Sequence, residues 1–391
     1  MVAPIVTPAY TNKSHLLADF PEMVVKWSTG VSPWRLTFEI TDDHEEETTF
    51  TEVYAPLPSE TQYVDKISVF DICELLRPYF NLSDHPGLVG FNTPGLKSQS
   101  DTRRVALKLI LHAPNDHNLG KRYFTYSNAP SGFLHSGSDD NGIGSRFLSR
   151  QNLYTVKSGH PCAVSWFGHG ETLKVKLLHY VDGIPQETAL TDVTSEDTNN
   201  MQTYNFTLEA LAEAAQIDVK NVIYADVQLF LNSAPQDSIR FMHEPRHRPY
   251  ERIFAFIGAM GQPEFIALTG TEQREAEFEG VFLMENNDYR KADTTLRRIH
   301  TSYTGPLNEG ERDTIWDMAA SPWVYVIENG QLREVTITEV ELTDNSPHRE
   351  PIGYNVKWHY TSEQRQRTFI RMPNVEEVEV ISNDDTIEGL E

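Results

Sequence analysis

The sequence predicts a mainly β protein made of two or three β-sandwich domains, of the immunoglobulin or fibronectin type III kind, with a few short helices. Short alternating or apolar runs recur along the chain, and clusters of Gly, Pro, Asn and Asp separate them. The chain has 391 residues, which is too long for one hydrophobic core. Its hydrophobic fraction of 39% suits thin sandwiches with a large surface better than one large enzyme core.

The N-terminal part predicts an arm followed by a first sandwich domain. Residues 1–20 combine prolines with mixed polarity, so we expect an extended arm there. Residues 21–113 predict the domain: strands MVVKW and WRLTFEI, an acidic hairpin tip, the returning strand TTFTEVYAPL and a last strand VALKLILHA. Between the last two strands, SVFDICELLRPYF (68–80) has apolar residues at helical spacing, with Ser68 as the expected N-cap.

A second sandwich domain is predicted over residues 145–234. Residues 114–144 are rich in Asn, Asp, Gly and Ser, which indicates a loop-rich linker or excursion before it. The domain continues with strands LYTVKS, CAVSWF and TLKVKLLHYV, a helix FTLEALAEAAQI and a strand VIYADVQLFL. The helix follows the hairpin strands in both domains, so we expect two related modules.

The C-terminal third predicts a basic linker, a β-rich module and an acidic tail. Residues 235–251 carry prolines and local positive charge and are interpreted as the linker. Residues 252–372 contain short strand patterns, one helical piece EGERDTIWDMAASP and a hairpin-like pair WVYVIENGQLREVTITEVEL. Residues 373–391 are acidic with little to pack, and we expect a tail there.

Composition excludes several classes of function. The net charge of −24, from 57 acidic and 33 basic residues, repels phosphate backbones and argues against direct nucleic-acid binding. Because the chain has no long apolar run and no signal-peptide pattern, we expect no membrane span and synthesis in a cytoplasm. Cys73 and Cys162 lie in apolar contexts without metal-ligand spacing, so we expect small buried hydrophobes rather than a disulfide.

Motifs for catalysis are missing from the sequence. It contains no nucleophile elbow, phosphate-binding loop, zinc-protease helix or dinucleotide fingerprint, so we expect no enzymatic activity and no cofactor. His160, His169 and Glu171 are the only metal-ligand candidates that we single out, since imidazole and carboxylate suit zinc or non-haem iron. Both histidines stand beside glycines, and we favour ordinary turn positions over a metal site.

Charged clusters provide the candidates for partner binding. The linker contains a basic patch, which could bind carboxylates of a neighbouring subunit or could be a solvated linker. Strand aromatics could line a sugar-binding face, but we favour core packing for them. The candidates are Arg246, His247, Arg248 and Arg252 in the patch, Glu376, Glu377, Asp384 and Asp385 in the tail, and the aromatics Trp166, Trp323, Tyr325, Trp358 and Tyr360.

Several segments resemble a family of phage proteins. They are the aromatic strand, Gly turn and EFIALTG strand of residues 254–270, LRRIHTSYTGPL, the helix of 315–322 that ends in Ser-Pro, and VYVIENGQLREVTI. EVYAPL before ISVFDICELLRPYF, and FLSRQNLYTVKSGHPCAVSWF, add to the pattern. Together they are similar to structural proteins from the tail regions of phages and prophages of Bacteroidetes gut bacteria.

The resemblance implies a non-enzymatic virion component of the tail, baseplate or neck, made in the host cytoplasm. It implies a symmetric oligomer that contacts other tail proteins and copies of itself through arms and strand edges. The alternative is a carbohydrate-binding or adhesion protein that holds a host-surface glycan on a face with exposed Trp and Tyr rings. A third hypothesis is a metal-dependent hydrolase that uses His160, His169 and Glu171.

Overall fold

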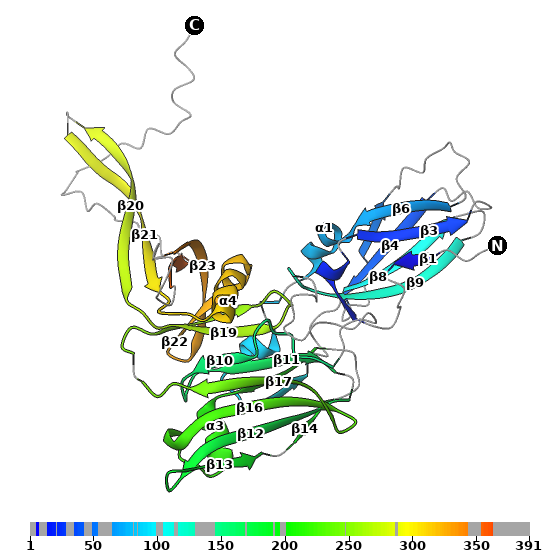
Figure 1. The fold of residues 1–391 in the computed structure, drawn as a ribbon. Helices are drawn as coiled ribbons and strands as arrows, with labels where there is room; N and C mark the ends of the chain where they lie inside the picture. Colours follow the sequence, from blue (N-terminus) through cyan, green and yellow to red (C-terminus); the bar gives the residue numbers. More distant parts are fainter. Residues whose placement is uncertain are drawn as a thin grey trace.

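The computed structural model of the chain is mainly β, as predicted, and contains three packed units (Figure 1). In the described part of the chain, no helix is long and apolar enough to cross a membrane. The structure describes residues 5–7, 14–20, 22–28, 35–42, 49–53, 65–80, 82–83, 85–98, 105–112, 116–129, 145–168, 170–190, 192–195, 201–246, 248–285, 288–342 and 353–362.

The first unit is a sandwich of two sheets. Its core contains Ile40 from one strand and Leu107, Leu109 and Phe124 from the next strands, all almost fully buried. One sheet has the order β1 (Ile5–Thr7), β3 (Glu22–Ser28), β6 (Asp65–Asp71). The other has the order β2 (Ser14–Leu16), β9 (Asp116–Thr125), β8 (Val105–His112), β4 (Arg35–Asp42), β5 (Thr49–Val53).

The second unit has two sheets as well. In β12, Leu173, Val175 and Leu177 are buried and alternate with half-buried residues, the period expected when one face covers a core. The larger sheet has the order β10 (Leu153–Val156), β17 (Ala234–His243), β16 (Val222–Leu231), β12 (Thr172–Val181), β13 (Ile184–Ala189), with β14 (Val193–Thr194) beside β12. The smaller has the order β11 (Cys162–Phe167), β15 (Met201–Phe206), β7 (Gly95–Ser98).

The larger sheets of the two units share one strand order, and β3 and β6 of the first smaller sheet correspond to β11 and β15 of the second. In each, a short strand lies parallel to the last strand of the unit: β2 with β9, and β10 with β17. In each, a helix follows the corresponding strand of the smaller sheet: α1 (Ile72–Leu76) after β6 and α3 (Leu208–Ala214) after β15. The remaining short helices are α2 (Pro86–Val89) and the 3-10 turns Leu17–Asp19, Arg77–Tyr79 and Val219–Asn221.

The structure corrects the predicted helix at residues 68–80. Ser68 lies inside β6 and pairs with Val25 of β3, so it is not an N-cap. The helix begins only at Ile72, because the ladder to β3 already satisfies the preceding backbone up to Asp71.

The predicted arm and linkers also contain strands. Residues 5–7 and 14–16 of the arm pair with β3 and β9. Leu16 is fully buried, which ties this segment to the body. The loop-rich stretch 114–144 contains β9, and the basic linker contains most of β17. Pairing with strands that are distant in sequence stabilises these strands. The local sequence is rich in Asn, Gly or Pro and does not indicate that pairing.

The third unit contains a seven-stranded antiparallel sheet and one long helix. Asn308 caps this helix with a capping box in which Glu311 bonds back to the Asn308 amide. The sheet has the order β19 (Pro263–Leu268), β18 (Arg252–Ile257), β22 (Val324–Glu328), β23 (Gln331–Leu342), β24 (Tyr354–Tyr360), β21 (Asp288–Tyr303), β20 (Glu272–Glu285), and the helix is α4 (Glu309–Ala320).

One end of this sheet is covered on both faces. In β18, Phe254 and Phe256 belong to the core that includes α4 and Trp358, whereas Ala255 and Ile257 belong to the core of the first unit. Successive strand residues point to opposite faces, so this strand joins two cores. A small apolar cluster connects all three units: Leu16, Ala129, Leu148, Phe167, Met201, Ala259 and Met260.

The other end of the sheet leaves the body as a two-stranded ribbon, formed by β20 and β21. In Figure 1 this ribbon, drawn in yellow-green and yellow, projects well beyond the three units. Among the described pairings, β21 meets β24 only at residues 300–303, and β20 meets β21 alone. Among the strands that the structure describes, the ribbon therefore has no third strand over most of its length.

Candidate functional site

In the structure, the metal-ligand candidates His160 and Glu171 contact different residues. His160 Nε2 lies 3.3 Å from Glu251 Oε2, and Lys157 Nζ lies 2.5 Å from the same oxygen. Glu171 is buried and accepts a hydrogen bond of 3.1 Å from Ser195 Oγ. His169 lies outside the described residues. Within the described ranges, no group of three His, Cys, Asp or Glu residues could hold a metal ion.

The Glu251 carboxylate ties the second unit to the third. Burial alone would raise the pKa of Glu251, but hydrogen bonds from His160 and Lys157 outweigh it and hold that pKa below its usual value. His160 and Lys157 follow β10, and Glu251 directly precedes β18. The group is therefore a structural clamp between units.

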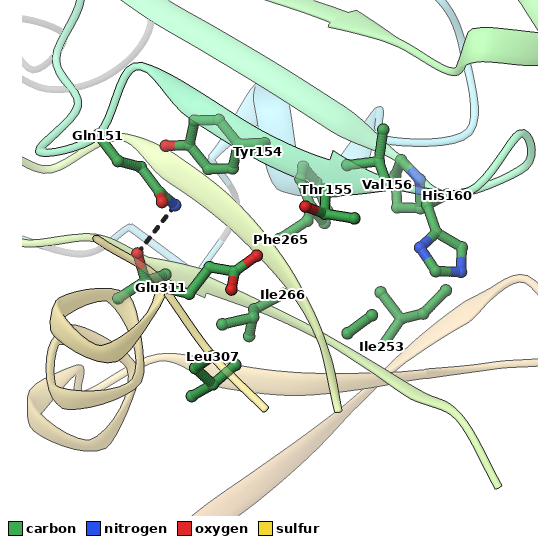
Figure 2. Close-up of a pocket in the computed structure, with 13 residues that line it drawn as sticks. Gln151, Tyr154, Thr155, Val156, His160, Ile253, Phe265, Ile266, Leu307 and Glu311 are labelled. Carbon is green, nitrogen blue, oxygen red and sulfur yellow. Dashed lines mark hydrogen bonds between the residues drawn. The ribbon is translucent and has the colours of Figure 1, made fainter. Parts of the chain in front are cut away.

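A cleft lies beside this clamp. Figure 2 shows Tyr154, Thr155 and Val156 of β10 on one side and Ile266 and Leu307 of the third unit on the other. The hollow has a volume of about 40 Å³ at this place and about 190 Å³ where it continues past Thr269 and Thr304. Pockets for small organic ligands usually have at least ~300 Å³, so the cleft is better described as a joint.

Polar groups in the cleft bond to one another. Gln151 Nε2 donates to Thr314 Oγ1 at 3.1 Å, the dashed line in Figure 2. Glu311 accepts from the Asn308 amide at 2.9 Å. Burial raises the pKa of Glu311, and this hydrogen bond opposes the rise. The Gln151–Thr314 bond joins α4 to the segment just before β10, whereas the Glu311 bond lies within the cap of α4.

Two acids lie buried where α4, β19 and the second unit meet. Burial, together with the nearby Asp317 charge, raises the pKa of Glu264 to about 8. Burial raises the pKa of Asp317 to about 6, although Arg150 Nε lies 3.2 Å from its carboxylate and opposes the rise. Burial also raises the pKa of the Tyr154 phenol. Glu264 is therefore mostly protonated near neutral pH.

The described members of the basic patch pair within their own chain. Arg246 is highly exposed, and its guanidinium lies 3.8 Å from Glu244, which is also 3.9 Å from Arg248. Arg252 Nε lies 2.9 Å from Glu272 and Nη1 lies 3.3 Å from Glu328. His247 and the tail residues Glu376, Glu377, Asp384 and Asp385 lie outside the described residues.

The ion pairs of Arg252 with Glu272 and Glu328 lie at the base of the ribbon. Glu272, at the start of β20, also accepts from Arg274 Nε at 3.0 Å and lies 2.8 Å from His300 Nδ1 of β21. Burial would raise the pKa of Glu272, but these partners lower it to about 2. The His300 ring stacks on Trp358, with 4.2 Å between centroids. The ribbon therefore leaves the sheet in a defined direction.

The strand aromatics pack in cores, as we favoured. Trp166 and Trp358 are fully buried. Trp323 and Tyr325 pack against the core of the first unit, and Tyr360 packs against the third core. Cys73 is half-buried and Cys162 is buried, and neither forms a disulfide. Burial raises the pKa of the Cys162 thiol.

No protein-family model matches this sequence, and no curated protein matches it significantly. The functional argument therefore depends on the geometry of the chain itself.

The ribbon is the feature that sequence reasoning missed. A signal for it exists: two long segments of alternating charged residues, EQREAEFE and DYRKADTTLRRIH, flank an Asn-Asn pair. These segments predict a hairpin of unusual length, with few apolar positions to place it on a core.

Proposed function

We propose that the protein is a structural subunit of a phage tail, baseplate or neck, which assembles in the virion as a symmetric oligomer through its strand edges. The observation that carries this proposal is the β20–β21 ribbon, which extends from the body (Figure 1) with edges that no described strand pairs over most of their length. Unpaired edges are templates for a strand of another chain. The assignment to a phage also depends on the resemblance of the sequence segments described above.

The architecture of the body supports a load-bearing role. Strand β7 leaves the first unit and pairs with β15 of the second, with Leu96 opposite Tyr204. Apolar residues of β18 complete the core of the first unit. The first and second units are thus each completed by an element from another part of the chain, which is suited to a scaffold that keeps its shape within an assembly.

The glycan-binding alternative has less support. It requires Trp and Tyr rings exposed on one face, whereas the five strand aromatics that could have formed such a face pack in cores.

Purified particles test the proposal. Antibodies against the chain should label one end or the tail of density-purified virions, and the protein should be present in them at a fixed number of copies. Recovery of the protein only from the soluble fraction of lysed host cells, with none in particles, would contradict it.

A further inference from the structure

Within the described part of the chain, the ribbon has two long open edges. Residues 288–299 of β21 pair with β20 on one side and with no described strand on the other, and β20 pairs with β21 alone among the described strands. A rise of ~3.3 Å per residue makes each edge about 40 Å long. A two-stranded hairpin is marginally stable by itself, and further strands stabilise it.

The two strands differ in charge. Beyond Arg274, β20 contains four acidic residues and no basic one: Glu275, Glu277, Glu279 and Glu285. The distal part of β21 contains four basic residues, Arg290, Lys291, Arg297 and Arg298, against the two acidic residues Asp288 and Asp293. One edge of the ribbon is therefore acidic and the other is basic.

Within the hairpin, few of these charged residues face a residue of opposite charge. Glu277 pairs with Arg297, but Glu275 is opposite Ile299 and Glu279 is opposite Thr295. A strand in a sheet has a neighbour on each side, and opposite charges on adjacent strands stabilise the pairing. Most charges of the ribbon can thus gain an opposite neighbour on a further strand.

The distal part of β20 also contains the apolar run Val281-Phe282-Leu283-Met284. Contiguous apolar residues favour burial, which pairing with another chain would provide.

We propose that the β20 edge of one copy pairs with the β21 edge of a second copy, an inference that rests on the proposed assembly function. Pairing of β20 with β20, or of β21 with β21, would place like charges side by side and is disfavoured. The contact is therefore head-to-tail, and it gives a closed ring when the rotation between copies closes. The alternation of β20 and β21 around such a ring would leave no free edge.

Charge reversal tests this contact. Variant A carries E275K, E277K and E279K, and variant B carries R290E, R297E and R298E. Light scattering should give an oligomeric mass for the unaltered chain and a monomeric mass for A or B alone. An equal mixture of A and B should regain the oligomeric mass, because the lysines of A then face the glutamates of B and the other two edges retain their natural charges.

A matched control separates this effect from a change in net charge. E187K, D192K and E213K change the charge by the same amount as variant A at exposed positions of the second unit, and they should leave the mass unchanged. A monomeric unaltered chain at all concentrations, or an oligomer that A and B do not disturb, would overturn the inference. If A and B nevertheless fail to enter virions, the assembly function stands and another protein binds the ribbon. Absence of the unaltered chain from virions would instead contradict the proposed function.

Discussion

The two ends of the seven-stranded sheet differ in what covers them. At one end, β18 alternates between two cores, with Phe254 facing α4 and Ala255 facing the first unit. At the other end, β20 and β21 continue without a third described strand (Figure 1). One sheet thus combines a segment that the chain stabilises by itself with a segment whose edges are left open. Under the proposed function, folding specifies the first end and assembly specifies the second.

An alanine substitution at each end of the sheet should show the largest difference in the free energy of unfolding. Phe254 is fully buried, with its ring 5.5 Å from that of Trp358 in an edge-to-face contact. Phe254→Ala should lower the free energy of unfolding by ~3–5 kcal/mol, because it removes buried area and leaves a cavity. Glu275→Ala, at an exposed position of the ribbon, should change it by less than ~0.5 kcal/mol. Urea unfolding of dilute protein measures both, and equal losses would refute the contrast.

The covered end should also respond to pH. Because the folded pKa of Glu264 is raised from 4.5 to about 8, its contribution to stability is present below pH 4.5 and is lost as the pH rises through about 8. The slope approaches about −1.4 kcal/mol per pH unit in this window. Asp317 adds a smaller loss between its usual pKa and about 6.

Glu264→Gln should flatten this slope while it retains an acceptor for Gln262 Nε2, which now donates to Glu264. Unfolding curves at pH 5, 6.5 and 8 for both proteins provide the measurement. The groups that face this carboxyl are Asp317 of α4 and Arg150 and Tyr154 of the second unit. If the variant retained the full slope, Glu264 would not be its source.

Loss of the N-cap of α4 should cause a smaller loss of stability at the covered end of the sheet. The Asn308 side chain accepts a hydrogen bond from the Glu311 amide at 2.8 Å, and the Glu311 carboxylate accepts one from the Asn308 amide. Asn308→Ala should cost ~1 kcal/mol of stability, whereas Asn308→Ser should cost little because serine also caps helices. Thermal unfolding compares the two variants, and an equal loss in both would show that the cap is not the cause.

Much of the local structure could be predicted from the sequence. The strand β12 alternates clearly, and α3 begins after Thr207, whose hydroxyl caps the Ala210 amide. Strand β7 could not be predicted, because its four residues have no pattern and only the ladder to β15 holds it. The helix at residues 68–80 was predicted too early, because apolar spacing does not reveal a strand that pairs with distant residues.

The sites could be predicted only in part, for a similar reason. His160 was singled out, but its partner Glu251 is 91 residues away in sequence and adjacent only in the fold. Arg252 was a candidate for binding carboxylates of a neighbouring subunit, with a solvated linker as the alternative. Its partners in the structure, Glu272 and Glu328, belong to its own chain. The sequence shows which charges are present, whereas the fold decides which of them meet.

A shortened ribbon tests the central claim most directly. Replacing residues 278–296 with Asn-Gly joins Glu277 to Arg297, which already pair, through a turn that favours hairpins. If the ribbon serves assembly, light scattering will give a monomer for the shortened chain and an oligomer for the intact chain, with equal thermal stability of the monomeric body. Equal masses for the two chains would contradict the account.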